Sequence, residues 1–324
     1  MKNLHGESNL QNVRSITSHL TWANHWDHLL ARWGVNRGEH RVTPGLYAIG
    51  NPTPDSLVFV TANYTFSFDA LRVALTDLDG FILVLDTQGI NVWCAAGKGT
   101  FGPDELVRKI ETTQLGEIVR HRTLILPQLG APGIAAHEVR KRSGFKVEYG
   151  PVRAADLSEY LKTHQATTEM RRVRFALRDR LVLIPVDLVY VLLPLLIAIL
   201  LGSKSLISAI LAGVVLFPVL LPWIPTSNFS TKGFILGGLV ALPFVVFQFL
   251  QTGNGFFFNL MRVLPIGLIL TAAVSFITLN QTGSTPITCW TSVRREIFRY
   301  VPVMAVMAGS GIILLILSLF GLGK

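Results

Sequence analysis

A single cysteine in a motif of small residues is the first feature of this sequence that could do chemistry. Cys94 lies in the stretch Gly89-Ile-Asn-Val-Trp-Cys-Ala-Ala-Gly-Lys98, directly after the apolar run 80–86, which has the length and composition of a buried strand. Gly89 ends that strand, Asn91 is a helix-capping residue type, and the alanines favour helix. We therefore predict that Cys94 lies on a short helix beyond the carboxyl end of a strand, where open α/β sheets bind their ligands.

The residue types alone leave several roles open for Cys94. It could be a small packing residue, a nucleophile, a redox thiol or a metal ligand. A nucleophile needs a base, and His121 and His137, the histidines of the central region, are at no diagnostic spacing from it. The first turn of a helix and the nearby Lys98 favour the thiolate form. The prediction from the residues is a reactive or ligating thiolate, with simple packing as the alternative.

The elements that must position this cysteine alternate between strand and helix. Strand-like runs occupy 45–50, 57–61, 81–85, 122–126 and 145–149, and helical patterns occupy 68–78, 104–113, 133–142 and 154–163. This alternation predicts an α/β domain over residues 44–165 with a mostly parallel sheet, preceded by an irregular or weakly helical lead-in over residues 1–43. The loops 61–67, 89–98, 126–132 and 150–153 should meet at one edge of the sheet. Their small and polar residues indicate a ligand there, or ordinary turn chemistry.

A second candidate for chemistry is the pair His25 and His28. Two imidazoles three residues apart face one way on a helix and could bind a metal. No third ligand is evident in the sequence, so the alternative is two surface histidines beside a packed tryptophan.

The second half of the chain has the composition of a membrane domain. Of the 29 Lys and Arg residues 22 precede residue 181, as do 18 of the 20 Asp and Glu residues. A basic juxtamembrane linker, 166–180, leads into a transmembrane domain, 181–324. Candidate spans of about the required length cover 181–201, 206–224, 233–250, 260–279 and 301–322. We expect an all-α transmembrane domain of about five helices.

Charge predicts the orientation of these spans. The arginines before residue 181 and Arg294, Arg295 and Arg299 fall on one side, which the positive-inside rule makes cytoplasmic. No signal peptide is evident at the amino terminus. We expect a multi-pass protein of the inner (cytoplasmic) membrane with its N-terminal domain in the cytoplasm. Asp187, inside the first span, is either functional or paired with the nearby arginines.

Other function classes are disfavoured. The net charge of +9 comes from basic residues beside membrane segments rather than along one polar face, so nucleic acid is not an expected partner. Cys94 and Cys289 are too few for a disulfide framework or for an iron–sulfur cluster in this chain.

The cysteine stretch carries a resemblance to a known family. Asn91-Val-Trp-Cys-Ala-Ala-Gly-Lys98 resembles the cap-helix motif of the mercury-methylating corrinoid proteins, the HgcA family. The similarity extends over roughly residues 30 to 324, including 60–64, 67–69, 123–132, 137–145 and 149–153, and a Thr-Gly-Ser signature at 282–284. The corrinoid iron–sulfur protein of the acetyl-CoA pathway is similar in the soluble domain, without the cysteine and the membrane helices.

The resemblance implies a fold, a cofactor and a reaction. The fold is a Rossmann-like corrinoid-binding domain, and the cofactor is cobalamin in its base-off form with the Cys94 thiolate as the lower axial cobalt ligand. The reaction is transfer of methyl from methyl-Co(III) cobalamin to Hg(II), forming methylmercury. Electrons would come from the ferredoxin-like iron–sulfur protein HgcB and the methyl group from a donor of one-carbon metabolism. The alternative is a membrane-tethered corrinoid methyl carrier of one-carbon and acetyl-CoA metabolism.

The resemblance also implies roles for individual residues. Those of the cap helix are Asn91, Val92, Trp93, Ala95, Ala96, Gly97 and Lys98, whose small members would let the helix lie against the flat macrocycle. Those of the loops around the corrinoid and its tail are Thr61, Asn63, Ser67, Gln128, Gly130, Gly150 and Pro151. Cys289 departs from the family pattern, and it could relay Hg(II) or be incidental.

Overall fold

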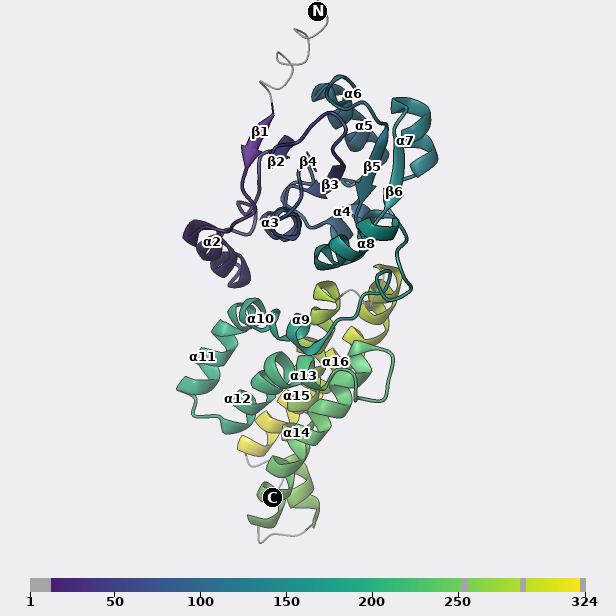
Figure 1. Ribbon diagram of the computed structural model, residues 1–324. Coiled ribbons are helices and arrows are strands. Elements are labelled where there is room, and N and C mark those ends of the chain that lie inside the picture. The colour runs from purple at the N-terminus through teal and green to yellow at the C-terminus, as the bar shows by residue number, and fades with distance from the viewer. Residues whose placement is uncertain (1–12, 252–255, 286–289, 321–324) are drawn as a thin grey trace, which may run out of the picture. The chain divides into compact units, whose positions relative to one another are not determined.

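The computed structural model describes residues 13–251, 256–285 and 290–320, and it divides into two compact units (Figure 1). The first unit comprises Met1–Val173 and the second Arg174–Lys324. Each unit has its own hydrophobic core.

The first unit is built on a six-stranded sheet. Its strands are β1 (Arg14–Ile16), β2 (Gly45–Ile49), β3 (Val58–Ala62), β4 (Gly80–Leu85), β5 (Thr123–Leu126) and β6 (Lys146–Tyr149), in the order β1-β2-β4-β3-β5-β6. β2 runs antiparallel to β4, and the other neighbouring strands pair in parallel. The mostly parallel sheet and the five predicted strands are confirmed.

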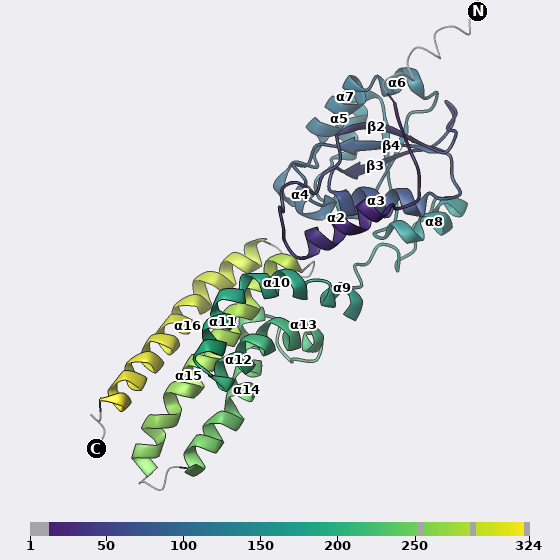
Figure 2. The ribbon, with the colours of Figure 1, turned by 90° about the vertical axis from the view of Figure 1, so that its left-hand side faces the viewer.

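Helices cover both faces of this sheet, because its central strands are apolar on both sides. In β4, Phe81, Leu83 and Leu85 face one core, whereas Ile82 and Val84 face the other, as the two-residue period of a strand requires. Figure 2 shows the resulting layers. One face carries α5 (Pro103–Thr112), α6 (Leu115–Ile118) and α7 (Ala136–Ser143), and the other carries α3 (Thr65–Ala74) and α8 (Leu157–Thr163).

The expectation of an irregular or weakly helical lead-in was wrong in part. β1 pairs with β2, from Arg14 opposite Tyr47, and α2 (Trp22–Arg32) is a regular helix. Thr21 starts α2 with a reciprocal capping box, in which its hydroxyl accepts from the Asn24 amide and Asn24 Oδ1 accepts from the Thr21 amide at 2.9 Å. A three-residue strand is too short to show a period, which is why the sequence pattern missed it.

A buried charge cluster holds this lead-in to the sheet. Asp69 accepts from Arg72 Nε at 2.6 Å and contacts His28 Nε2 at 2.7 Å. Arg72 also donates to the carbonyls of Thr17 and His19, each at 2.8 Å. Thus His28 is bound to a carboxylate of α3, and no group of three or more potential metal ligands occurs among the described residues.

The second unit is helical, and among its described residues three helices are long and apolar enough to cross a membrane. They are α14 (Phe229–Gln251), α15 (Phe256–Asn280) and α16 (Trp290–Leu319). The first predicted span is instead a pair bent by 63°, Leu177–Tyr190 and Leu192–Leu200, and the second lies in a shorter apolar helix, Lys204–Leu220. Hydropathy measures the length of an apolar run but not its bends, so the expected five spans reduce to three, or four if the bent pair is one span.

Small residues and buried charges pack the second unit. Gly237 of α14 leaves no room for a side chain against Thr271 of α15, a close approach typical of membrane helices. At the start of α14, Glu296 accepts from the Phe229 and Ser230 amides at 3.2 and 3.0 Å. Lys232 donates to the carbonyls of Leu221 and Ile224. Arg180 donates to the carbonyls of Pro218 and Val219, both at 2.7 Å.

We predict that Asp69→Ala releases α2 from the first unit. The substitution leaves Arg72 buried without its carboxylate, which costs about 3–5 kcal/mol by the behaviour of broken buried ion pairs. Amide hydrogen exchange over residues 14–32 should become faster, while exchange in β3 and β4 changes less. The control is Asp55→Ala, which breaks an exposed ion pair with Arg120. Equal exchange in the two variants would contradict a structural role for the cluster.

Candidate functional site

The helix that carries Cys94 has two distinct faces. α4 (Val92–Lys98) follows β4, as predicted, and in Figure 2 it lies beyond the ends of β3 and β4. Val92, Ala95 and Ala96 are buried against the core, so these members of the cap motif pack inward. The opposite face consists of Trp93 and Cys94, which are half-buried, and Gly97 and Lys98, which are exposed. The thiol therefore lies on the outward side of the helix.

The turn before α4 is fixed by a buried amide. Asn63, at 2% exposure, accepts three hydrogen bonds on Oδ1: from the Thr87 amide at 3.0 Å, the Thr87 hydroxyl at 2.8 Å and the Gly89 amide at 3.0 Å. Gln88 and Gly89 both adopt positive φ, 59° and 73°, which turns the chain sharply. Asn91 then starts the helix, because its Oδ1 accepts from the Cys94 amide at 2.9 Å.

The remaining predicted loop residues lie at the same edge. The Gln128 amide, in η2 (Gln128–Gly130), donates to the Pro151 carbonyl at 3.3 Å, and the Gly150 amide donates to Leu126 at 2.8 Å. These bonds tie the loop after β5 to the loop after β6. Gly130 is buried against the Phe101 ring, Thr61 is buried in β3, and Ser67 is half-buried on α3.

A backbone contact joins α4 to the loop after β5. A Cβ atom on Gly133 would lie 2.7 Å from Ala96 Cα and 2.5 Å from the Phe101 carbonyl oxygen. The two chain segments thus touch with no side chain between them. The loops after β3, β4, β5 and β6 consequently form one connected edge, as the alternation of strands and helices predicted.

Two features of this edge are not explained by the protein's own packing. The buried Oε1 of Gln128 has no hydrogen-bond partner among the described residues. A Cβ on Gly97 would meet nothing within 4 Å, although glycine inside a helix costs roughly 1 kcal/mol relative to alanine. A polar ligand atom beside Gln128 and a flat surface over Gly97 would account for both.

The strand order marks this edge as the ligand side of the sheet. β4 lies on one side of β3 and β5 on the other, so the chain moves one way from β3 to β4 and then crosses back past β3 to reach β5. Open α/β sheets bind ligands outside the carboxyl ends of the strands at such a switch point. Asn63 follows β3 and Gln128 follows β5, the two neighbouring strands on either side of the switch point.

Tyr64 is a residue of this edge that the predicted site residues did not include. It follows Asn63, and burial raises the pKa of its hydroxyl, with smaller opposing effects from Arg32 and Arg37. The charges of Asp27 and Cys94 raise the Tyr64 pKa further, so the hydroxyl lies within electrostatic reach of the thiol. Its position directly after a strand that ends at the site was the signal available in the sequence.

The two histidines considered as a base for Cys94, His121 and His137, lie elsewhere in the first unit. His121 precedes β5, at the amino ends of the strands, where its Nδ1 accepts from the Thr123 amide at 3.2 Å and its Nε2 donates to the Ser56 carbonyl at 2.9 Å. His137 lies on the surface of α7. Cys289 lies outside the described residues.

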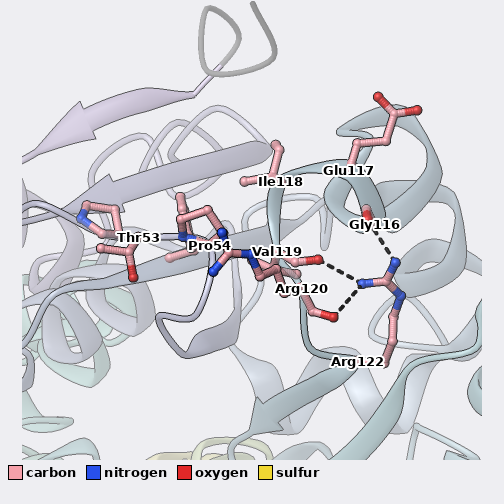
Figure 3. A pocket seen from close by; sticks show the side chains of 10 residues that line it. Thr53, Pro54, Gly116, Glu117, Ile118, Val119, Arg120 and Arg122 are labelled. Atoms are coloured by element: carbon pink, nitrogen blue, oxygen red, sulfur yellow. Dashed lines mark hydrogen bonds between the residues drawn. The ribbon is translucent and has the colours of Figure 1, made fainter. Parts of the chain in front are cut away.

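A pocket of about 290 Å³ also lies at the amino ends of the strands, away from Cys94 (Figure 3). In Figure 3, Arg122 donates to the carbonyls of Gly116 and Val119 at 2.9 and 2.7 Å. The guanidinium therefore supplies hydrogen-bond donors to carbonyl groups at the end of α6. None of the predicted site residues lines this pocket. The carboxyl edge is therefore the better candidate for the site.

Comparison with known proteins identifies relatives of the first unit. The model of the family described as CO dehydrogenase/acetyl-CoA synthase delta subunit matches residues 36–161. Residues 36–161 are thus similar in sequence to subunits of acetyl-CoA decarbonylase/synthase and to a corrinoid/iron-sulfur protein. The matched relatives are subunits that are longer than the matched region. This region includes the loops after β3 and β5.

Individual relatives match over the same part. The acetyl-CoA decarbonylase/synthase complex subunit gamma of Archaeoglobus fulgidus is 34% identical over 124 residues, which is 38% of this chain and 26% of the relative. The same subunit of Methanopyrus kandleri is 33% identical over 128 residues, 39% and 27% of the two chains. The corrinoid/iron-sulfur protein large subunit of Moorella thermoacetica is 24% identical over 129 residues, 39% and 28%. The chain thus spans about a quarter of the length of these relatives.

We predict that Gly133→Ala displaces α4. The added methyl group meets backbone atoms of Phe101 and Ala96, which cannot rotate away, so overpacking should cost about 1–3 kcal/mol and raise hydrogen exchange over residues 92–99. Gly97→Ala is the matched control, because its methyl group meets no protein atom and improves helix propensity. Faster exchange of α4 in Gly97→Ala than in Gly133→Ala would show that this contact does not position the helix.

The titration of Tyr64 offers an independent measurement at this edge. We expect the absorbance difference at alkaline pH between the unsubstituted chain and Tyr64→Phe to give a pKa above the ordinary value of 10.0. The folded chain holds this proton more tightly than the unfolded chain, so the stability it contributes is complete below pH 10 and is lost as pH rises through the folded-state pKa. A midpoint at the ordinary value of 10.0 would mean that the hydroxyl is exposed to solvent, and a midpoint below it would mean that Arg32 and Arg37 outweigh burial.

Proposed function

We propose that the chain is a corrinoid-dependent methyltransferase that forms methylmercury from inorganic Hg(II), with the Cys94 thiolate as the lower axial ligand of cobalt. The corrinoid would bind base-off at the carboxyl edge of a Rossmann-like domain, residues 44–165. The observation that carries the proposal is the outward face of α4, where the thiol lies between a tryptophan and an unshielded glycine. The motif of this helix is also the stretch that resembles the HgcA family.

The residues at this edge fit a planar tetrapyrrole ligand. Cys94 and Gly97 are three residues apart on one helix face, so the position next to the thiol carries no side chain. A flat macrocycle could therefore approach the helix backbone closely. Trp93 and Lys98 border the same face, and the unpaired Gln128 Oε1 offers an acceptor at the edge.

Each part of the edge would have a distinct task. Asn63 and Asn91 hold the turn and the first helical turn that present the thiolate. Ser67 and Gln128 would lie beside the corrinoid and its tail. The buried Thr61, Gly130, Gly150 and Pro151 would hold the strand end and the loops that surround it. When bound, a methylated corrinoid would supply the methyl group that Hg(II) accepts, and the Cys94 thiolate would hold the cobalt and donate electron density to it.

The proposal includes partners and a location. The ferredoxin-like protein HgcB would provide the electrons that return cobalt to its reduced state, and a methyl donor of one-carbon metabolism would reload it. The second unit would place the protein in the cytoplasmic membrane with the first unit in the cytoplasm. Its three long apolar helices support a membrane location.

The second candidate function is a membrane-tethered corrinoid methyl carrier of one-carbon metabolism. It is favoured by the relatives, which are subunits of acetyl-CoA decarbonylase/synthase and a corrinoid/iron-sulfur protein. Deleting the gene distinguishes the two functions. Loss of methylmercury formation with unchanged growth on one-carbon substrates supports the methyltransferase, and a growth defect larger than the loss of methylation supports the carrier.

We predict that Cys94→Ala abolishes methylmercury formation while the protein still inserts into membranes. The purified chain, reconstituted with cobalamin, should show a visible spectrum of thiolate-ligated cobalt, and Cys94→Ala should lose that signature. Cys289→Ala is the control, and it should leave the spectrum unchanged. A fall in methylation in Cys289→Ala with a normal spectrum would indicate that this cysteine relays Hg(II).

Two results would contradict the proposal. Identical cobalt spectra in Cys94→Ala and the unsubstituted chain would exclude thiolate ligation, and absence of any bound corrinoid would exclude both functions. Gly97→Ala gives a further check, because a methyl group against a close-packed macrocycle should weaken corrinoid binding roughly tenfold or more. The same variant remains stable without the corrinoid, which separates ligand contact from misfolding.

A further inference from the structure

The helix α2 carries its apolar side chains on the outside. Trp22, Trp26, Leu29 and Trp33 are 89%, 62%, 45% and 44% exposed, and their spacing places them along one side of the helix. A helix on the surface of a globular domain normally turns this stripe toward the core. No residue of α2 is buried, so the stripe contributes little to the packing of the first unit.

The inward side of α2 is held by polar contacts instead. His28 contacts Asp69 and stacks on the Phe66 ring at 4.3 Å between centroids. Asp27 contacts the buried ring of His40 at 2.7 Å, and the Arg32 guanidinium lies 4.5 Å from the centre of the Phe66 ring. These contacts fix the orientation of the helix with the tryptophans facing away from the domain, so the exposed stripe is a defined surface.

We infer that this aromatic stripe lies in the headgroup region of a lipid bilayer. The same chain contains three helices long enough to cross a membrane, and the first unit ends at Val173, where the second begins. A bilayer that holds the second unit is therefore tethered to the first unit through the chain, which raises its effective concentration at the surface of that unit. Neither a soluble partner nor a second copy has this advantage.

The side chains of α2 match the chemistry of that region. Tryptophan is enriched at membrane–water interfaces, because its ring is apolar and its N–H group can bond to headgroups or water. The acids near the stripe, Asp27 and Glu39, face His40 and Arg41. Residues 22–41 contain three arginines and two acids, a formal charge of +1, so this segment carries no net negative charge that would repel anionic lipids. An aromatic stripe with basic neighbours is the pattern of a helix lying in the membrane surface.

The experiment uses two quenchers of tryptophan fluorescence on the full chain. The protein is reconstituted into vesicles of phosphatidylcholine and phosphatidylglycerol, in a Trp223→Phe, Trp290→Phe background that silences the tryptophans of the second unit. The signal of α2 is the difference between this background and the same chain with Trp22, Trp26 and Trp33 also changed to Phe. Trp93 is present in both and cancels.

Lipids brominated on their acyl chains should remove roughly half or more of the α2 signal, because interfacial helices insert their apolar face about 5–10 Å into the headgroup boundary. Aqueous iodide should remove little of it. Quenching by iodide without quenching by bromine would overturn the inference, because the stripe would then face water. Resistance to both quenchers would also overturn it, because a protein surface would then cover the tryptophans.

Discussion

The Asn63 carboxamide is the interaction on which the candidate site depends. One buried side-chain oxygen accepts from two backbone amides and one hydroxyl of the turn between β4 and α4. A buried acceptor that lost these donors would pay its full desolvation cost, so the turn is strongly tied to the end of β3. This turn determines where α4 begins, and therefore which way Cys94 faces. The edge of the sheet and the thiol are thus positioned as one piece.

This arrangement shows what a sequence can and cannot predict about such a site. The strand before Cys94, the cap at Asn91 and the short helix were all predictable, because apolar runs and capping residues have strong local preferences. The task of Asn63 was not, because its partners are 23 to 26 positions away and depend on which strands are neighbours. Polar residues at a ligand edge look alike in sequence whether they contact a ligand or hold a loop.

The same limit explains the differences in the rest of the fold. β1 is defined by its pairing with β2, and three residues carry no period that reveals it. The bend between Tyr190 and Leu192 in the second unit leaves no mark in hydropathy, which reports only that the run is apolar. α2 was obscured for another reason. Its apolar residues face outward, whereas a sequence pattern is usually interpreted by assuming that an apolar stripe faces the core. On that assumption α2 does not fit the domain.

The buried charges of the second unit have a consequence for the surroundings that its helix ends can tolerate. Arg180 and Lys232 bind carbonyls at the end of the Lys204–Leu220 helix and in the segment after it, and Glu296 binds the first amides of α14. Helix ends normally need water for these groups, and that need keeps a turn close to a membrane surface. Here the protein supplies the partners itself. Fewer peptide groups at the turn between the two helices therefore depend on water, so this turn tolerates less polar surroundings than a helix end normally requires.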